Sequence, residues 1–278
     1  EITGRKLSDV KVVISGAGAA GLSVAGLIRH LGVKRDNILM VDRQGVIYEG
    51  RTEGMDQFKS GFAVKTKKRT LAEAFEGADV FMGLSAKGTV SKDMVKSMAK
   101  NPMIFPMANP DPEITPEDIR EVRSDAIIAT GRSDYPNQIN NVLGFPYIFR
   151  GALDVRARTI NEEMKVAAAK ALAQLAREDV PDEVAAAYAG ARPTFGPDYI
   201  IPAPFDPRLI WYVPPLVAQA AMDTGVARKP IADMQAYRDS LAQRLDPAAS
   251  FLQRIYGKVR GEKKKRIVFA EGEEPSVI

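Results

Sequence analysis

The feature that most constrains this chain is a glycine motif, Gly16-Ala-Gly18-Ala-Ala-Gly21. It lies between an apolar run at 11–15, typical of a buried strand, and a stretch at 18–31 whose apolar residues recur with helical spacing. Gly16 permits a tight turn, Gly18 lets the backbone approach a pyrophosphate, and Gly21 lets the helix pack closely on a sheet. A strand, a glycine turn and a helix in this order predict a dinucleotide-binding unit rather than a merely tight turn.

The residues after the second predicted strand leave the type of dinucleotide open. Asp42 ends that strand, 21 positions after the last glycine of the motif, where an acid can accept from a ribose 2′-hydroxyl. A carboxylate at this point favours NAD because it repels a 2′-phosphate. Arg43 could instead pair with that phosphate, and so could three cations of the following loop, Lys65, Lys67 and Lys68. These cations could equally form a solvated face of the loop.

Short apolar runs alternate with helical segments over the first 130 residues. Strands are predicted at 11–15, 37–42, 79–84, 103–108 and 125–129, with helices at 18–31, 70–77, 91–100 and 115–122. Loops are predicted at 43–69 and 131–150, helices at 153–177, 182–191, 216–224 and 231–244, and an extended proline-rich segment at 199–215. The alternation predicts an α/β fold, a Rossmann-like doubly wound parallel sheet with additional C-terminal helices.

Composition excludes several kinds of chemistry. The 278 residues include no cysteine and one histidine, so thiolate chemistry and a histidine metal cluster are excluded. No apolar run approaches the ~18 residues that span a bilayer, so we expect a cytoplasmic protein without membrane contact. The net charge of +4 is concentrated in residues 256–266, where six basic residues and one acid give +5 and leave −1 for the rest. This distribution indicates a solvated linker rather than a nucleic-acid surface.

Amide side chains follow the fourth and fifth predicted strands. Asn109 stands at the carboxyl end of the fourth strand, where it could meet a substrate carboxylate or a nicotinamide ribose, although an Asn-Pro turn is the alternative. Arg132 and the paired Asn140 and Asn141 could hold carboxylates, or the segment could be an Asx-rich loop that caps itself.

Five motifs in order resemble the bacterial malic enzymes. They are Val-Val-Ile-Ser-Gly-Ala-Gly-Ala-Ala-Gly, Val-Asp-Arg-Gln-Gly-Val-Ile-Tyr-Glu-Gly-Arg, Gly-Leu-Ser-Ala-Lys-Gly, Ala-Asn-Pro-Asp-Pro-Glu and Asn-Gln-Ile-Asn-Asn-Val-Leu-Gly-Phe-Pro. The likeness implies that 1–256 is an NAD(P)-binding domain whose helices at about 200–256 return to pack on an N-terminal domain. Residues 257–278 resemble a basic linker and the first strand of a truncated phosphotransacetylase-like domain, as in the hybrid malic enzymes.

The resemblance implies oxidation of malate by hydride transfer and decarboxylation to pyruvate and CO₂ with Mg²⁺ or Mn²⁺. Hybrid members usually prefer NADP, so the resemblance favours NADP over NAD. The implied cofactor residues are Gly16, Ala17, Gly18, Ala19, Gly21, Asp42, Arg43, Ser85 and Asn109, and the implied malate residues are Asn109 and Asn141.

The family's tyrosine acid, lysine base and three carboxylate metal ligands lie upstream of the glycine loop, in a segment that this chain lacks. We therefore expect no catalytic or metal-ligating residue in this chain, which is predicted to be inactive alone. The resemblance also implies acetyl-CoA as a regulator through the C-terminal domain, and a homo-oligomer. Two alternatives are a non-catalytic nucleotide-sensing module, which has no need of Asn109, Asn140 and Asn141, and an amino-acid-type dehydrogenase, which would carry a paired lysine motif upstream.

Overall fold

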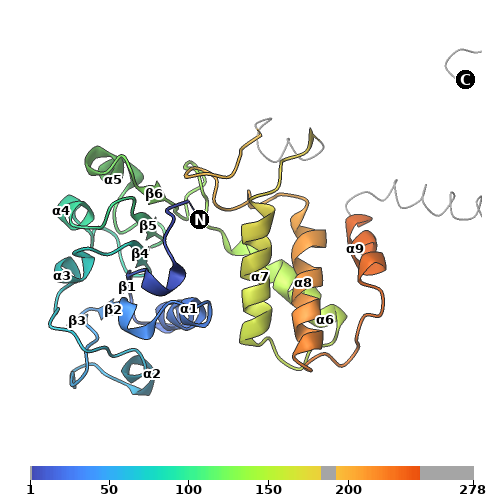
Figure 1. Ribbon diagram of the computed structural model, residues 1–278, viewed down its shortest axis with the longest axis horizontal. Helices are drawn as coiled ribbons and strands as arrows, with labels where there is room; N and C mark the ends of the chain where they lie inside the picture. Colours follow the sequence, from blue (N-terminus) through green and yellow to red (C-terminus); the bar gives the residue numbers. More distant parts are fainter. Residues whose placement is uncertain (1, 183–191, 245–278) are drawn as a thin grey trace, which may run out of the picture.

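A six-stranded sheet forms the core of the N-terminal half of the chain (Figure 1). The computed structural model describes residues 2–182 and 192–244, so the predicted helix at 182–191 and everything from 245 onward lie outside the described residues, Asp182 apart. The strands are β1 (Val12–Ser15), β2 (Ile38–Asp42), β3 (Gly45–Val46), β4 (Val80–Gly83), β5 (Met103–Pro106) and β6 (Ile127–Ile128). Their order is β3-β2-β1-β4-β5-β6, with every neighbouring pair parallel except β2 and β3.

The order of the strands reverses beside β1. The chain extends the sheet from β1 to β2 and β3, then crosses back to add β4, β5 and β6 on the other side of β1. The predicted Rossmann-like doubly wound sheet is confirmed, and the carboxyl ends of β1 and β4 form its topological switch point. The loop predicted at 43–69 is partly wrong, because it contains the antiparallel β3 and the short helix α2 (Gln57–Ser60).

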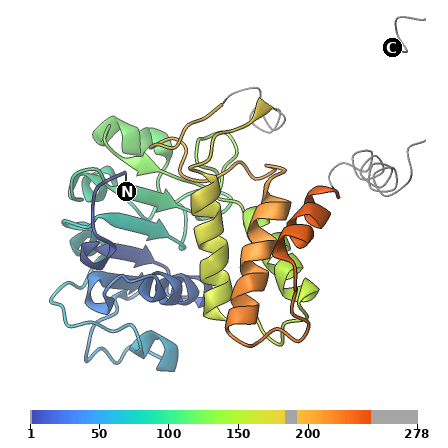
Figure 2. The same ribbon diagram turned by 45° about the vertical axis from the view of Figure 1, so that its right-hand side comes forward.

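Side chains alternate between two buried faces of the sheet. Val13 and Phe81 face the core under α3 (Leu71–Phe75), α4 (Lys92–Lys96) and α5 (Pro116–Val122). Ile14 and Met40 face the core under α1 (Ala19–His30). Successive residues of a strand point to opposite sides, so continuous apolar runs are needed when helices cover both faces. Figure 2 shows the resulting layers, with the strands between the two sets of helices.

Side-chain caps define where α3 and α5 begin. The Thr70 hydroxyl accepts from the Glu73 N–H, and the Glu73 carboxylate accepts from the Thr70 N–H in return. Thr115 accepts from the Asp118 N–H, and Pro116 fills the first helical position, where its missing N–H leaves no hydrogen bond unmade. The predicted start of the helix at 115–122 is therefore confirmed, and each cap contributes roughly 1 kcal/mol to stability.

In the described part of the second half, four helices form a bundle, α6 (Phe145–Asp154), α7 (Glu162–Leu175), α8 (Leu209–Asp223) and α9 (Met234–Ala242). Its core joins residues of all four helices, and α7 also contacts α1 of the sheet half. The loop predicted at 131–150 is wrong over its last six residues, which start α6. The single helix predicted at 153–177 is also wrong, because Arg156 adopts a left-handed φ of 49° and Asn161 caps a new helix.

Two prolines lie inside α8, so the extended segment predicted at 199–215 is wrong from residue 209 onward, and the helix predicted at 216–224 is only its second half. Pro214 and Pro215 are both buried. A Cβ on Gly151 of α6 would lie 2.5 Å from the Pro214 carbonyl oxygen, so the two helices are in close contact at this point. Burial of α8 between α6 and α7 offsets the local cost of the prolines.

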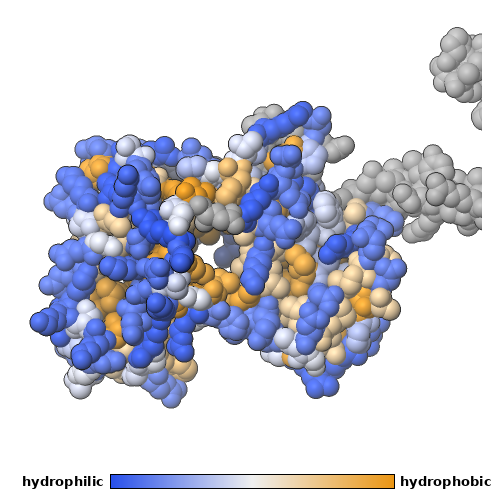
Figure 3. Space-filling view, viewed as in Figure 1, coloured by the Kyte–Doolittle hydropathy of each residue, from blue (hydrophilic) through white to orange (hydrophobic). Residues whose placement is uncertain are grey.

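The surface in Figure 3 is mainly hydrophilic around the sheet-covering helices and carries more apolar colour between the two halves and on the helical half. Among the described residues, four phenylalanines and two leucines are exposed, namely Leu7, Phe58, Phe145, Phe149, Leu153 and Phe205. Within residues 2–182 and 192–244, no helix combines the length and the apolarity that crossing a bilayer requires.

Candidate dinucleotide site

A cleft of about 610 Å³ opens at the switch point of the sheet. Its lining comes from the ends of β1, β2 and β4 and from the loops that follow them: Ser15, Gly16, Ala17, Gly18, Val41, Asp42, Arg43, Gln44, Lys59, Leu71, Leu84, Ser85, Ala86 and Thr89. In open α/β sheets ligands bind outside the carboxyl ends of the strands at the switch point. The cleft therefore lies where the glycine motif predicts a ligand.

Two glycines of the motif are required by close backbone contacts. Gly16 has a φ of +112°, and a Cβ there would lie 2.2 Å from the Leu84 carbonyl oxygen. A Cβ on Gly21 would lie 1.8 Å from the Gly16 carbonyl oxygen. The tight turn expected of Gly16 and the close packing of helix on sheet expected of Gly21 are both present in the structure.

The middle glycine of the motif, Gly18, opens the cleft to the amino end of α1. Gly18 is the N-cap residue of this twelve-residue helix, and a Cβ there would meet nothing within 4 Å. No acid lies in the first turn, which begins at Ala19. The unpaired N–H groups and the positive end of the helix dipole therefore point into free space, with no acid in the first turn of α1 beside them. This arrangement suits a phosphate.

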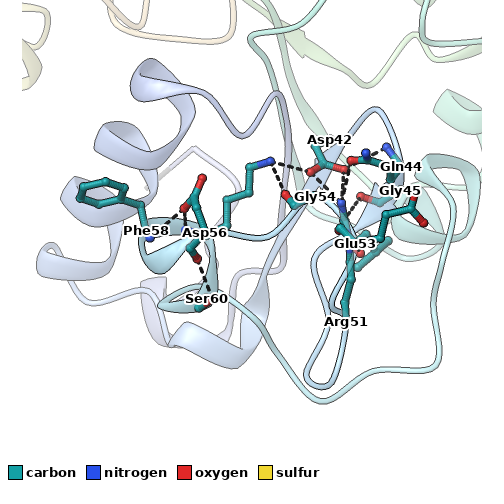
Figure 4. Close-up of polar contacts among 11 residues, drawn as sticks. Asp42, Gln44, Gly45, Arg51, Glu53, Gly54, Asp56, Phe58 and Ser60 are labelled. Carbon is teal, nitrogen blue, oxygen red and sulfur yellow. Dashed lines mark hydrogen bonds and ion pairs between the residues drawn. The ribbon is translucent and has the colours of Figure 1, made fainter.

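Asp42 is held by two cations at the β2 side of the cleft (Figure 4). Arg51 Nη2 donates to both carboxylate oxygens at 2.7 and 2.8 Å, and Lys59 Nζ donates to Oδ2 at 3.0 Å. The Gln44 N–H donates to Oδ1 at 3.0 Å. An ionised carboxylate offers about four acceptor positions, and these four contacts occupy them.

The surrounding loop fixes both cations. The other Arg51 nitrogens donate to the carbonyl oxygens of Gly45, Val46 and Glu53 at 2.9–3.1 Å, and only 4% of the side chain is exposed. Lys59 belongs to α2, whose N-cap residue Asp56 accepts from the N–H groups of Phe58 and Lys59. The Lys59 ammonium also donates to the Gly54 carbonyl oxygen at 2.8 Å. Burial raises the pKa of the Asp42 carboxyl, but the hydrogen bonds from Arg51 and Lys59 lower it more, so the net pKa lies below its usual value.

The basic residues of the loop divide between two ends of the sheet. Arg43 lines the cleft, is exposed, and has no ion pair or hydrogen bond within the described part of the chain. Lys65 and Lys68, for which phosphate pairing and a solvated loop face were the two alternatives, line a separate cavity at the amino ends of the strands, where Lys68 donates to the Glu76 carbonyl oxygen. These two lysines therefore lie away from the cleft, and Lys59 lines it instead.

Ser85 forms the β4 side of the cleft, where hydroxyl and carboxylate groups are linked. Its hydroxyl accepts from the Ser15 hydroxyl at 3.0 Å and donates to Glu113 at 3.1 Å. Asn109 is exposed in the loop after β5, next to Ala108, and its peptide bond to Pro110 is cis. Ser85 lines the cleft whereas Asn109 does not.

In the loop after β6, one of the two neighbouring asparagines caps a local turn and the other is exposed. The Asn140 side chain accepts from the Val142 N–H at 3.0 Å and caps a short 3₁₀ turn, Asn141–Leu143, which agrees with the Asx-loop alternative. Asn141 is exposed beside it. Arg132 pairs with Asp134 at 2.6 Å.

The described residues do not fit a divalent cation. No group of three or more histidine, cysteine, aspartate or glutamate side chains that could hold a metal occurs in residues 2–182 and 192–244. Mg²⁺ and Mn²⁺ need several oxygen ligands that converge on one point. No metal-dependent step can therefore be assigned to these residues.

Comparison with known proteins decides the family. Residues 1–188 match the family described as "Malic enzyme, NAD binding domain". The chain belongs to this malic enzyme family. It is 66% identical over 277 residues to an NADP-dependent malic enzyme of Rhizobium meliloti (strain 1021), and 49% identical over 278 residues to an NAD-dependent malic enzyme of the same organism. Both alignments cover 100% of this chain and 36% of the relative, so the chain spans about a third of their length.

The fold of a solved malic enzyme agrees with this assignment. The crystal structure of the malic enzyme from Pyrococcus horikoshii Ot3 aligns with a TM-score of 0.77 and 33% identity, over 94% of this chain and 58% of that one. The NAD-binding domain of a malic enzyme thus accounts for the cleft, the glycine turn and the sheet order.

Sequence patterns missed Arg51, Lys59 and Glu113 as members of the site. Arg51 and Lys59 lie in a segment of four glycines and many charges, where no periodicity marks their contacts with Asp42. Glu113 lies in a proline-rich turn, and only the structure shows that its carboxylate is buried. The motif Ala-Asn-Pro-Asp-Pro-Glu contained the one available signal, an acid four residues after Asn109.

Proposed function

We propose that this chain is the dinucleotide-binding part of a malic enzyme that oxidises and decarboxylates malate to pyruvate and CO₂, with NADP preferred over NAD. The family assignment and the names of the two Rhizobium meliloti relatives support the reaction. A bound nicotinamide cofactor would supply the hydride acceptor. The chain's own part is to bind and orient this cofactor.

The state of Asp42 carries the preference for NADP. Protein donors fill its acceptor positions, so it has little capacity left for a ribose 2′-hydroxyl. Its single negative charge is more than offset by Arg51 and Lys59, which leaves +1 from the three groups. Exposed Arg43 adds a further positive charge on the same side of the cleft. A 2′-phosphate would therefore be attracted to this side rather than repelled.

The proposal also gives a role to each of the remaining site residues. Ala17 and Gly18, with the first N–H groups of α1 from Ala19, would hold the pyrophosphate, in the turn shaped by Gly16 and Gly21. Ser85 would lie at the nicotinamide side of the cleft. Asn109 would reach the nicotinamide ribose or malate, and Asn141 would reach malate.

The proposal extends to parts of the enzyme beyond the described residues. Residues 1–256 would form the cofactor domain, with 257–278 as the linker and first strand of a phosphotransacetylase-like domain that responds to acetyl-CoA. The helices from about 200 onward would pack on the N-terminal part, which would supply the acid, the base and the Mg²⁺ or Mn²⁺ ligands. A homo-oligomer and a cytoplasmic location belong to the same proposal.

The test compares the full-length protein with the 278-residue chain. Each is incubated with malate, Mn²⁺ and either NADP or NAD, and formation of reduced cofactor and of pyruvate is measured. Turnover by the full-length protein, faster with NADP, and none by the isolated chain is the expected result. Robust turnover by the isolated chain, or no turnover by the full-length protein, would contradict the proposal.

A further inference from the structure

Glu113 carries a completely buried carboxylate, with 0% of the residue exposed. Its Oε1 accepts from the Ser85 N–H at 2.8 Å and from the Ser85 hydroxyl at 3.1 Å, and its Oε2 accepts from the Ala108 N–H at 3.1 Å. No ion pair to Glu113 occurs among the residues that the structure describes. A buried charge without a cation is costly, so these three hydrogen bonds must stabilise the carboxylate.

The three donors belong to two loops that are far apart in the sequence. Ser85 follows β4 and Ala108 follows β5, and because these strands are parallel neighbours their carboxyl ends lie at one edge of the sheet. Glu113 lies in the turn before α5, and each of its carboxylate oxygens accepts hydrogen bonds from one of the two loops. Through the Ser85 hydroxyl the same network reaches Ser15 at the end of β1.

The sheet is shaped to admit this carboxylate. A Cβ on Gly83, the last residue of β4, would lie 2.4 Å from the carboxyl carbon and one oxygen of Glu113. Glycine is therefore required at the end of this strand for the acid to lie against the backbone, although the conformation of Gly83 is not left-handed. Both Gly83 and Glu113 belong to motifs that the sequence presents as separate.

We propose that Glu113 is a positioning residue, which sets the distance between Ser85 on the cleft and the loop that carries Asn109. This inference rests on the proposed function, since Ser85 and Asn109 are assigned there to the nicotinamide side of the cofactor. Glu113 itself does not line the cleft. It acts through the two loops, and the adenosine side of the cleft, around Asp42, does not depend on it.

The geometry explains why a carboxylate is needed. Each oxygen accepts from a different loop, and both loops present N–H donors. Glutamine has the same shape but only one acceptor oxygen, so its amide N–H₂ would face an N–H donor on one of the two loops. Glu113→Gln should therefore release one loop while largely retaining the packing. Glu121→Gln on α5 is the matched control, because Glu121 is exposed.

The test uses two ligands of different length. NADP spans both sides of the cleft, whereas adenosine 2′,5′-bisphosphate occupies only the adenosine side. Binding of each to the 278-residue chain is measured by calorimetry for wild type, E113Q and E121Q. E113Q is expected to weaken NADP binding about ten-fold and to leave the bisphosphate unchanged, while E121Q changes neither.

Each other outcome has a defined meaning. Equal affinity of E113Q and wild type for NADP overturns the positioning role, and a parallel loss of both ligands shows a merely structural one. Should E113Q fail to fold, Glu113→Asp replaces it, because aspartate keeps the carboxylate but shortens its reach. Loss of NADP binding alone then supports the positioning role, and loss of binding of both ligands contradicts it. Failure of wild type to bind NADP would instead contradict the proposed function.

Discussion

The two sides of the cleft each depend on one acid, largely buried at Asp42 and fully buried at Glu113, and the acids are stabilised differently. On the β2 side, Asp42 lies between Arg51 and Lys59 and is paired with both. On the β4–β5 side, Glu113 accepts only from two N–H groups and a hydroxyl. The two cations around Asp42 leave a net positive charge at the surface of the cleft. The neutral donors around Glu113 add no positive charge to the cleft.

This difference matches what each side would have to do. A side that binds a doubly charged phosphate gains from excess positive charge, which a fully paired carboxylate with two cations supplies. A side that must hold a nicotinamide ring and a substrate at fixed positions gains from rigid loops without a strong added field. Under the proposed function, cations would attract the phosphate at one side, and neutral donors would hold the loops in position at the other.

The largest expected effect comes from removing one cation of the β2 side. Arg51→Met leaves the largely buried Asp42 with one cation, Lys59, beside the Gln44 N–H, and removes the Arg51 donor from three carbonyl oxygens. We expect a loss of about 3–5 kcal/mol in the free energy of unfolding, measured by urea denaturation. Arg43→Met, at an exposed position, is the control and should change it by less than about 0.5 kcal/mol. A loss below about 1 kcal/mol for R51M would show that the pairing of Asp42 contributes little to stability.

The glycine turn that joins the two sides should respond next. Gly16→Ala places a Cβ 2.2 Å from the Leu84 carbonyl oxygen, at a position whose backbone is left-handed. The free energy of unfolding should therefore fall by at least about 2 kcal/mol. Gly18→Ala has free space and an ordinary φ of −83°, so its stability should stay within about 0.5 kcal/mol of wild type. We expect G18A to lose affinity for NADP nevertheless, because its methyl group faces the open cleft. Thermal melts and NADP titrations separate the two effects, and equal melting temperatures for both variants would refute the assignment.

A smaller and selective effect is expected from the exposed cation. Arg43→Ala should weaken NADP binding about ten-fold, or roughly 1.4 kcal/mol, and should barely change NAD binding, because only NADP carries a 2′-phosphate. Calorimetric titration with both cofactors measures this. Equal losses for NADP and NAD would remove Arg43 from the phosphate site.

The smallest effect concerns acid stability. The pKa of Asp42 is lower in the folded chain than its usual 3.8, so its stabilisation is complete above that value and is lost as the pH falls through the folded pKa. Wild type should therefore lose stability more steeply below about pH 4 than Asp42→Asn does. Urea midpoints between about pH 2 and 6 test this, with exposed Asp223→Asn as control. Parallel curves for wild type and D42N would exclude the effect.

The sequence predicted the sheet half well and the helical half poorly, for physical reasons. Five strands and α1 follow from apolar runs and from the glycine turn, which are local signals. The helix α8 could not be predicted, because Pro214 and Pro215 contradict it locally and only burial against α6 supports it. The turn at Arg156 that ends α6 and separates it from α7 also lacks a strong breaker residue.

For the site, the sequence located the cleft but not its electrostatics. Asp42 was found by spacing, yet its partners Arg51 and Lys59 depend on how a 27-residue loop folds back, from Arg43 to Arg69. The choice between NAD and NADP stayed open for that reason. A lone acid and a neutralised acid look identical in sequence.

The most direct test of the excess positive charge beside Asp42 is a calorimetric titration of the 278-residue chain with NADP and with NAD in the same buffer. If the cleft carries excess positive charge beside a fully paired Asp42, NADP should bind at least about ten-fold more tightly than NAD. If NAD binds as tightly as NADP, or if neither binds, the proposed reading of the β2 side is contradicted.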